Sequence, residues 1–201
     1  MANPSFSKQQ ASDMIGWGTS EERVHIIGYR SPISKYGEYD DTIAIISPEQ
    51  YLEVRANTLP SVWKQGIAKL MPGTYKYSCG LHGIHHLTSS KDDQAILNWL
   101  DNNKGKDYPA SLIPKGKLVP YWAFRQAGPV TLIRDGATKP ETELNPALYP
   151  FIDIHHGGFN LTSSEGCQTI FPTFWANFRS IGYSEMSKYS QTSISYHLIQ
   201  L

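Results

Sequence analysis

The chain is poor in cysteine, has no net charge and contains no long apolar run. Two cysteines among 201 residues are too few for a disulfide-dense secreted scaffold, and we expect Cys79 and Cys167 to be free thiols. The 18 basic residues balance the 18 acidic ones, so the overall charge predicts neither a nucleic-acid partner nor an anionic membrane surface. No segment approaches the ~18 apolar residues of a membrane-spanning helix, so we expect no membrane insertion.

The amino-terminal stretch MANPSFSKQQASDM lacks the basic start and the apolar run of a secretory signal peptide. We therefore expect synthesis in the cytoplasm, with any action outside it depending on another export route. At 40% apolar residues the chain can bury a full core. Because it contains no internal repeat, we expect one globular domain over residues 1–201.

Most of the chain has the character of β-structure, which predicts a mainly β, α+β fold. The segment 66–83 alternates apolar and polar side chains on both sides of Pro72-Gly73, which predicts two strands around a turn. Runs of β-branched and aromatic residues bounded by glycine or proline predict further strands at residues 24–29, 42–47, 51–54, 118–124, 129–136 and 192–200.

Three short helices are expected between these strands. Residues 5–15 lack helix breakers and predict a helical cover within residues 1–20. The sequence KDDQAILNWLDNN has apolar residues at helical spacing and predicts an inserted helix within residues 88–117. Pro172 suits the first turn of a third helix, which Gly182 is expected to end.

The segment at residues 152–170, IDIHHGGFNLTSSEGCQTI, carries the residues best suited to chemistry. A short apolar strand ends in two histidines, two glycines turn the chain, and a polar loop leads to Cys167. A thiol with a pKa near ~8.5 is mostly protonated at neutral pH, and a nearby imidazole raises its thiolate fraction. The pattern predicts Cys167 as a nucleophile and His155 or His156 as its base; the alternatives are a buried apolar cysteine and histidines bonded to the backbone.

Strand geometry discriminates between the two histidines. Adjacent residues of a strand point to opposite faces, so only one of them can meet the thiol. If Ile152 and Ile154 face the core, then Asp153 and His155 face the other way. This favours His155 over His156 as the base.

Five glycine and polar residues complete the predicted site. Gly157 and Gly158 form the turn beside a substrate groove, and Gly166 lets the backbone turn sharply and offer amide hydrogens to an oxyanion. Ser164 is expected to orient the imidazole or to cap the loop. Glu165 either favours an imidazolium partner of the thiolate or is a solvated acid.

The order of these elements resembles the catalytic domain of the L,D-transpeptidases, the YkuD-like family of cell-wall enzymes. The family signature, a His-Gly pair followed by Ser-His-Gly-Cys, is matched by IHHG at residues 154–157 and SEGC at residues 164–167. Upstream, MPGTYKYS at residues 71–78 is similar to the family's Thr-Pro-x-Gly-x-Phe-x-Ile hairpin. Glu165 stands where the family has a second histidine, Thr169 stands where it has arginine, and the intervening loop is shorter.

The resemblance implies a β-sandwich of mixed sheets with a Cys/His groove. It also implies an enzyme that attacks L,D peptide bonds of peptidoglycan stem peptides through a thioester acyl-enzyme. An amine acceptor gives transpeptidation, whereas water gives carboxypeptidase or endopeptidase activity. The departures at Glu165 and Thr169 favour hydrolysis, because recognising an acceptor is the more demanding half of transfer. No cofactor is implied.

A second cluster of histidines lies upstream, beginning at Cys79. The spacing of Cys79, His82, His85 and His86 suits tetrahedral zinc, but no second CxxC or HxxxH motif is present, so we expect no metal site. If the similar hairpin lies beside the active site as in the family, His82 is expected near the thiol, in place of the missing second histidine.

Without a signal peptide, an enzyme of this type would reach the periplasm through a secretion machine, as a delivered antibacterial effector, or through phage lysis. An effector would have an immunity or inhibitor protein as a partner. Two alternatives remain open at the level of sequence. One is a metal-dependent hydrolase that uses the histidine and cysteine clusters as ligands. The other is a non-enzymatic binding or virion-associated module in which the IHHGG and SSEGC segments are only tight turns.

Overall fold

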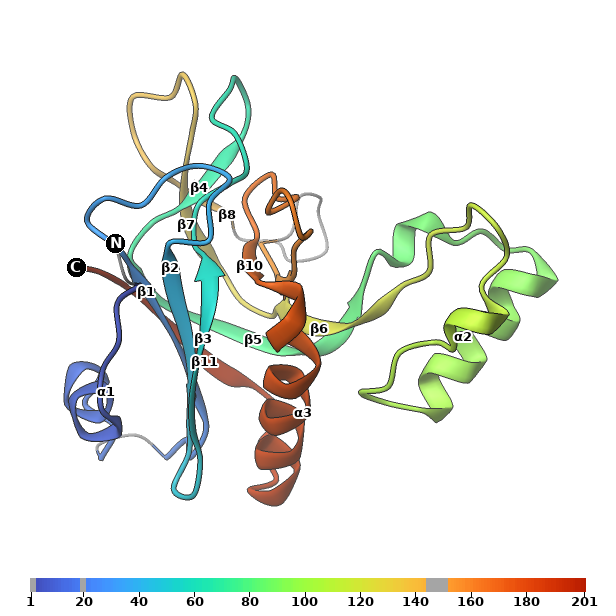
Figure 1. Ribbon diagram of the computed structural model, residues 1–201, viewed down its shortest axis with the longest axis horizontal. Helices are drawn as coiled ribbons and strands as arrows, with labels where there is room; N and C mark the ends of the chain where they lie inside the picture. Colours follow the sequence, from blue (N-terminus) through green and yellow to red (C-terminus); the bar gives the residue numbers. More distant parts are fainter. Residues whose placement is uncertain (1–2, 19–20, 144–151) are drawn as a thin grey trace.

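A mixed β-sheet dominates the computed structural model, which describes residues 3–18, 21–143 and 152–201 (Figure 1). Eight of the described strands form a closed barrel in the order β1-β11-β5-β6-β9-β10-β3-β2, and three form a separate sheet in the order β4-β7-β8. The barrel strands are β1 His25–Arg30, β2 Asp41–Ile46, β3 Tyr51–Asn57, β5 Gly73–His82, β6 Tyr121–Gln126, β9 Ile154–His156, β10 Gln168–Ile170 and β11 Ile194–Gln200. The small sheet contains β4 Ala68–Leu70, β7 Val130–Arg134 and β8 Glu141–Glu143.

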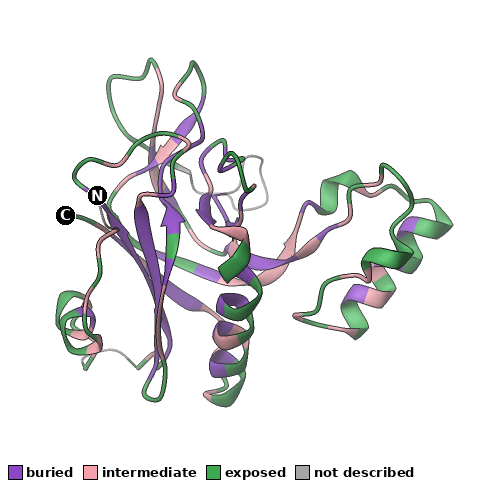
Figure 2. Cartoon of the chain, in the orientation of Figure 1, coloured by how far each residue is buried: buried purple, intermediate pink, exposed green. Residues whose placement is uncertain are grey.

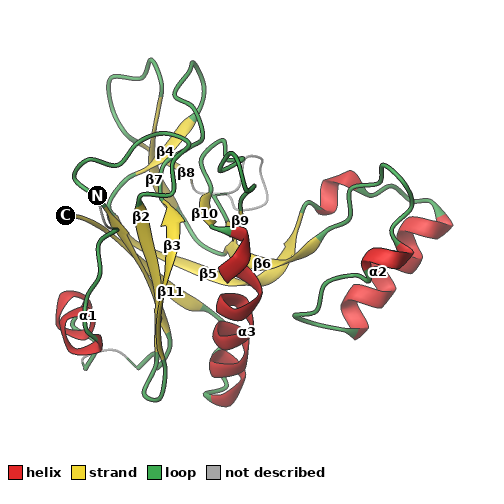
Figure 3. Ribbon diagram, viewed as in Figure 1, coloured by secondary structure: helices red, strands yellow, loops and turns green. Residues whose placement is uncertain are grey.

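The predicted mainly β, α+β class is confirmed, with three α-helices beside the mixed sheets (Figure 3). Eight of these strands are hydrogen-bonded in a closed order, and β4, β7 and β8 form a second sheet. Closure depends on β9 and β10, which are only three residues long and pair in parallel with each other. β9 joins β6 and β10 joins β3, both antiparallel.

The predicted strands are all present, but the turn at Pro72-Gly73 has a different role from the one expected. β4 pairs with β7 in the small sheet, whereas β5 pairs with β11 and β6 in the barrel. Leu70 lies opposite Leu132, and Gly73 lies opposite Leu198. The turn therefore carries the chain from one sheet to the other and does not close a hairpin.

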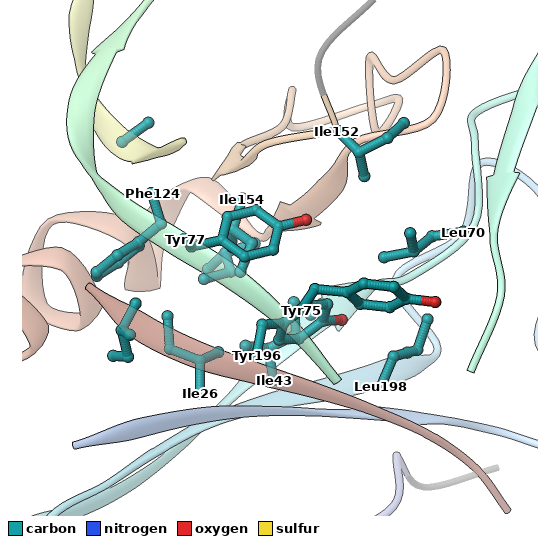
Figure 4. Packing of buried hydrophobic residues seen from close by; sticks show 14 of the residues in the cluster. Ile26, Ile43, Leu70, Tyr75, Tyr77, Phe124, Ile152, Ile154, Tyr196 and Leu198 are labelled. Atoms are coloured by element: carbon teal, nitrogen blue, oxygen red, sulfur yellow. The ribbon is translucent and has the colours of Figure 1, made fainter. Parts of the chain in front are cut away.

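Apolar side chains fill the barrel (Figure 4). Tyr77 and Tyr196 are fully buried and meet edge to face, with ring centroids 5.6 Å apart. Burial of large side chains of this kind is the main favourable contribution to folding. The labelled members of the cluster are Ile26, Ile43, Leu70, Tyr75, Tyr77, Phe124, Ile152, Ile154, Tyr196 and Leu198.

Two helices cover the barrel. Helix α1, Lys8–Ile15, begins with a capping box at Ser7 and packs Ala11 on the outer face of β1 and β2, which explains why both strands are buried along their whole length. Helix α3, Pro172–Lys188, adds Trp175 and Phe178 to the barrel core. All three predicted helices exist, but Gly182 does not end the third one.

Gly182 lies inside α3 because the helix approaches the barrel most closely there. A Cβ atom at this position would lie 2.6 Å from Cζ of Phe124 and 2.9 Å from Cδ1 of Ile45. The absence of a side chain at Gly182 therefore allows α3 to pack closely on the barrel. Glycine destabilises a helix by about 1 kcal/mol relative to alanine, and the close packing offsets this cost.

The segment between β5 and β6 forms a projecting lobe (Figure 1). It contains helix α2, Lys91–Asn102, and two short 3₁₀ helices, Ile84–His86 and Ala110–Leu112. Ile96 and Leu100 of α2 pack on Trp122 in a small cluster of their own, and most of the lobe surface is exposed (Figure 2). The predicted insertion at residues 88–117 falls within this lobe. None of the helices among the described residues is long and apolar enough to span a membrane.

A pair of histidines joins β1 to β11. Nδ1 of His25 lies 3.0 Å from Nε2 of His197, whose Nδ1 lies 3.0 Å from the Thr74 hydroxyl. Burial lowers the pKa of His25, and burial together with the neighbouring His25 lowers the pKa of His197 to about 4. Both rings are therefore neutral in the folded protein at neutral pH.

This pair predicts an acid-sensitive stability. A histidine whose folded pKa is depressed stabilises the protein above its unfolded pKa of ~6.5, and that contribution is lost as the pH falls toward the folded value. We expect His197→Gln to lose less stability than the wild type between pH 7 and pH 4, by on the order of 1–2 kcal/mol. Urea unfolding across this pH range measures the difference. The exposed His86→Gln is the control; an equal change in both variants would contradict the prediction.

Candidate active site

Cys167 lies immediately before β10, beside Asp153, which directly precedes β9. The parallel pairing of these strands places Gln168 opposite Ile154, and the N–H of Gln168 donates to the carbonyl of Asp153 at 2.8 Å. The backbone N–H of Asp153 in turn donates to Sγ of Cys167 at 3.3 Å. The thiol is half-buried and held by the backbone of β9.

The predicted facing of β9 is confirmed. Ile152 and Ile154 belong to the core, and Ile154 lies opposite Phe124 of β6 (Figure 4). Side chains alternate along a strand, so Asp153 and His155 point to the other face. Both line the cavity that also contains Cys167.

This cavity has a volume of about 210 Å³. His156 is not among its lining residues; it borders the adjoining cavities, one of which also contains Gly157 and Gly158. His155 therefore lines the same cavity as Cys167, whereas His156 does not. The side chains at the cavity of Cys167 that can carry charge or a proton are His82, His85, Arg125, Asp153, His155, Glu165 and Cys167.

A buried carboxylate organises one wall of the cavity. Asp153 is only 1% exposed. Its Oδ2 lies 2.8 Å from Nδ1 of His82 and 3.3 Å from Nη1 of Arg125, and its Oδ1 accepts from the N–H of Gln126 at 3.2 Å. Charge-assisted contacts of this kind fix both partners in orientation. His82 is thus brought to the site, as the sequence suggested.

The ring of His155 is held in one tautomer. Its Nδ1 lies 2.5 Å from the carbonyl oxygen of His156 and 3.1 Å from the Tyr121 hydroxyl. A carbonyl only accepts hydrogen bonds, so Nδ1 carries the proton and Nε2 is the basic nitrogen. The ring also stacks on His82, with centroids 4.2 Å apart.

His155 and Cys167 are both uncharged in the folded protein at neutral pH. Burial, and then the neighbouring His82, hold the pKa of His155 well below its usual value, so the imidazole is neutral. Burial and the charge of Asp153 raise the pKa of Cys167 to about 12, although the Asp153 amide and Arg125 act in the opposite direction. The sequence favours a thiolate, whereas the cavity of the folded protein is lined by a neutral thiol and a neutral imidazole.

Asp153→Asn is expected to make Cys167 more reactive toward a small alkylating reagent. The substitution removes a negative charge that raises the thiol pKa, and each unit of lowering gives about tenfold more thiolate at pH 8. Glu165→Gln removes a more distant charge and is expected to have a smaller effect in the same direction. The rate of iodoacetamide labelling, with a Cys79→Ala background, measures both. No acceleration in Asp153→Asn would show that burial alone sets the pKa.

The loop before Cys167 depends on a glycine. Gly166 has φ of 154°, and a Cβ atom there would lie 2.8 Å from Cδ1 of Ile152 and 3.1 Å from the carbonyl oxygen of Ala68. Its N–H donates to Oγ of Ser164 at 3.0 Å, and that hydroxyl donates to the carbonyl of Cys167 at 2.6 Å. Ser164 therefore fixes the loop, and the Gly166 amide is engaged within it, not directed at an oxyanion. Glu165 is exposed at the cavity edge.

Gly157 and Gly158 lie in the turn after β9. The N–H of Gly157 donates to the carbonyl of Ile170 at 3.0 Å, and the carbonyl of Gly158 accepts from the hydroxyl of Tyr39 at 2.8 Å. These bonds hold the loop between His156 and Cys167 against the barrel.

No known family model, curated protein or solved structure matches the chain. The functional assignment therefore rests on the geometry of the cavity and on the motifs in the sequence.

Two charged residues of the site were not assigned roles from sequence. Asp153 had a signal, because it alternates with His155 on the same strand. Arg125 had none: it reaches the cavity from β6, and its side chain crosses Gly80 of β5, where a Cβ atom would lie 2.7 Å from Cγ of Arg125. Thr169, at the position of the family arginine, is completely buried.

The residues of the suggested zinc cluster do not converge. Sγ of Cys79 lies 3.8 Å from Sδ of Met186, while His82 binds Asp153. The rings of His85 and His86 are tilted by 49° against each other in an exposed 3₁₀ turn, with centroids 4.0 Å apart. Within the described ranges, no three His, Cys, Asp or Glu side chains are grouped so as to hold a metal ion.

Two further cavities lie next to the cavity of Cys167, and we call the three together the groove. A neighbouring cavity of about 410 Å³ shares His82 and His155 with it and extends to Leu118. A third, of about 200 Å³, shares Tyr121 with the second and reaches Trp175. The groove thus runs from the thiol along the base of the projecting lobe.

Proposed function

We propose that the protein is a cysteine-dependent enzyme of the L,D-transpeptidase type, acting on peptidoglycan stem peptides. The observation that supports the proposal is that Cys167 and a neutral His155, whose Nδ1 is bonded to a backbone carbonyl, line the same cavity. A thiol and a base in a groove are the parts required for acyl transfer. We also propose that the fold is related to that of the L,D-transpeptidase catalytic domain.

In the proposed reaction, Nε2 of His155 takes the proton of Cys167 as sulfur attacks the carbonyl carbon of the L,D peptide bond. The tetrahedral intermediate collapses to a thioester, the C–N bond breaks, and the imidazolium gives its proton to the departing amine. A water or an amine then attacks the thioester, with His155 removing its proton, and the thiol is restored. Because the pKa of Cys167 is raised, deprotonation accompanies attack and does not precede it.

Arg125 gives the site a cation that the sequence motif lacks. We assign it to the negative charge of the substrate, either a stem-peptide carboxylate or the developing oxyanion. Its contact with Asp153 keeps it at the cavity wall in the absence of substrate. His82, bound to the same carboxylate and stacked on His155, positions the base.

The groove supports an extended peptide substrate. It continues for two further cavities beyond Cys167, bordered by Tyr121, His156 and Trp175, whose rings offer broad apolar contact surfaces. We assign hydrolysis to the enzyme in preference to transfer, because Glu165 and Thr169 replace the family's second histidine and arginine. A lytic role as a delivered effector or phage protein in the periplasm, with an immunity protein as partner in the first case, belongs to the same proposal.

Incubation with purified muropeptides, followed by mass spectrometry, tests the proposed function. Loss of the terminal D-amino acid from tetrapeptide stems indicates L,D-carboxypeptidase activity, cleavage between stems indicates endopeptidase activity, and an increase in cross-linked dimers indicates transfer. A thioester adduct on the intact protein would locate the acyl group at Cys167. Unchanged muropeptides, or full activity only with added metal, would contradict the proposal.

A further inference from the structure

A second, larger cavity lies away from the thiol. It has a volume of about 580 Å³ and shares no lining residue with the cavity of Cys167. The loop at residues 31–40 forms one side; Phe159 and Asn160, from the loop between the histidines and Cys167, help to form the other. We call it the loop cavity.

Aromatic rings form one wall of the loop cavity. Phe171 meets Tyr39 edge to face at 5.2 Å between centroids, and Phe159 meets Phe171 edge to face at 5.8 Å. Phe159 is 69% exposed, although a large apolar side chain gains free energy by burial. Its ring contacts Phe171, which in turn contacts Tyr39, so Phe159 lies at the cavity where it can cover a ligand.

The polar lining is balanced in charge. Lys35 lies 3.4 Å from Glu38, and the backbone N–H of Lys35 donates to Asp40 at 2.9 Å. Nε of Arg55 donates to the carbonyl of Tyr39 at 2.8 Å, and its guanidinium lies 5.4 Å from the ring centroid of Phe171. Two cations and two carboxylates favour neither an anion nor a cation, but they offer both donors and acceptors.

We propose that the loop cavity binds an uncharged oligosaccharide. Sugar rings present an apolar face of C–H groups, which suits the exposed ring of Phe159. The hydroxyls around their edge suit carboxylates, amides and guanidinium groups in both hydrogen-bonding senses. The volume falls within the roughly 300–1,000 Å³ of pockets that enclose drug-sized ligands, enough for more than one sugar ring.

The loop cavity is coupled to the active site through one segment of chain. Phe159 and Asn160 lie in the loop that leads to Cys167, and Tyr39, which lines the loop cavity, donates its hydroxyl to Gly158. A bound saccharide would therefore hold the reactive loop in place. The binding step itself is independent of the thiol and of the proposed peptide chemistry.

Calorimetric titration of the full chain with a trisaccharide tests the proposal. We use N,N′,N″-triacetylchitotriose and maltotriose, which separate an N-acetylated ligand from a plain one. Binding of either is expected, with Phe159→Ala weakening it by about tenfold or more, which corresponds to about 1.4 kcal/mol. Leu112→Ala removes another exposed apolar side chain, 57% exposed and outside the cavity lining, and is expected to leave affinity within about twofold.

The controls keep this result separate from the proposed enzyme activity. Cys167→Ala is expected to bind the trisaccharide like the wild type, even though it is expected to be inactive. Thermal unfolding of each variant checks that the fold is intact, since Phe159 is mostly exposed. The proposal is overturned if neither sugar binds at about 10 mM, if Phe159→Ala binds as well as Leu112→Ala, or if saccharide shifts in an NMR spectrum map to the groove of Cys167 only.

Discussion

Cys167→Ala is expected to abolish the cleavage of muropeptides, with turnover falling by at least about 10³-fold. The side chain supplies the bond-forming atom. Cys79, the other cysteine, cannot replace it, because it lies on β5 against Met186 of α3 and does not line the cavity of Cys167. Product formation per unit time, followed by chromatography and mass spectrometry, gives the measurement. A thioester adduct should be present in the wild type and missing in the variant.

Cys79→Ala is the matched control for the loss of the nucleophile. It removes the second thiol, also half-buried, and is expected to keep activity within about twofold. Two further outcomes would argue against a specific role of Cys167. Retention of activity by Cys167→Ala would remove the basis of the proposed function, and loss in both variants would indicate a general dependence on packing.

His155→Ala is expected to lower turnover by roughly 10²–10⁴-fold, the usual effect of a general base. His156→Ala, a change of the same size one residue away, is expected to keep turnover within about tenfold, because His156 borders only the adjoining cavities. The difference arises from the two faces of β9. The pair of variants therefore separates proton transfer from substrate contact.

The pH dependence of turnover adds a second measurement for His155. Because burial depresses its pKa, the imidazole stays unprotonated well below pH 6.5, so the wild-type rate should not fall between pH 8 and pH 6 through protonation of this residue. Equal losses in His155→Ala and His156→Ala, or a steep decline of the wild-type rate near pH 6.5, would contradict the assignment of His155.

Local patterns in the sequence were sufficient for most elements of the fold. The β-branched run VHIIGY becomes β1, TSISYHLIQ contains β11, and Ser7 caps α1 as its side chain permits. Each of these features depends on neighbours in the chain. The alternation of Ile152, Asp153, Ile154 and His155 was also sufficient to place two site residues on one face.

Features that depend on distant parts of the chain were not predictable in this way. Gly182 has the same local properties as a helix terminator, and only the approach of Phe124 and Ile45 explains its place inside α3. Arg125 is 42 residues before Cys167, and the space for it is created by Gly80 on another strand. The raised pKa of Cys167 likewise follows from burial and from Asp153, which no motif encodes.

The three-residue strands β9 and β10 both close the barrel and hold the candidate reactive groups, and this shared duty limits how the protein can diversify. A substitution there must preserve the chemistry and keep the barrel shut, whereas the lobe between β5 and β6 has its own small cluster and borders the groove from outside. Changes in lobe length or composition can alter which substrates enter without disturbing the pairing of β9 with β10. Substrate range is therefore expected to evolve through the lobe, while the reactive strands stay fixed.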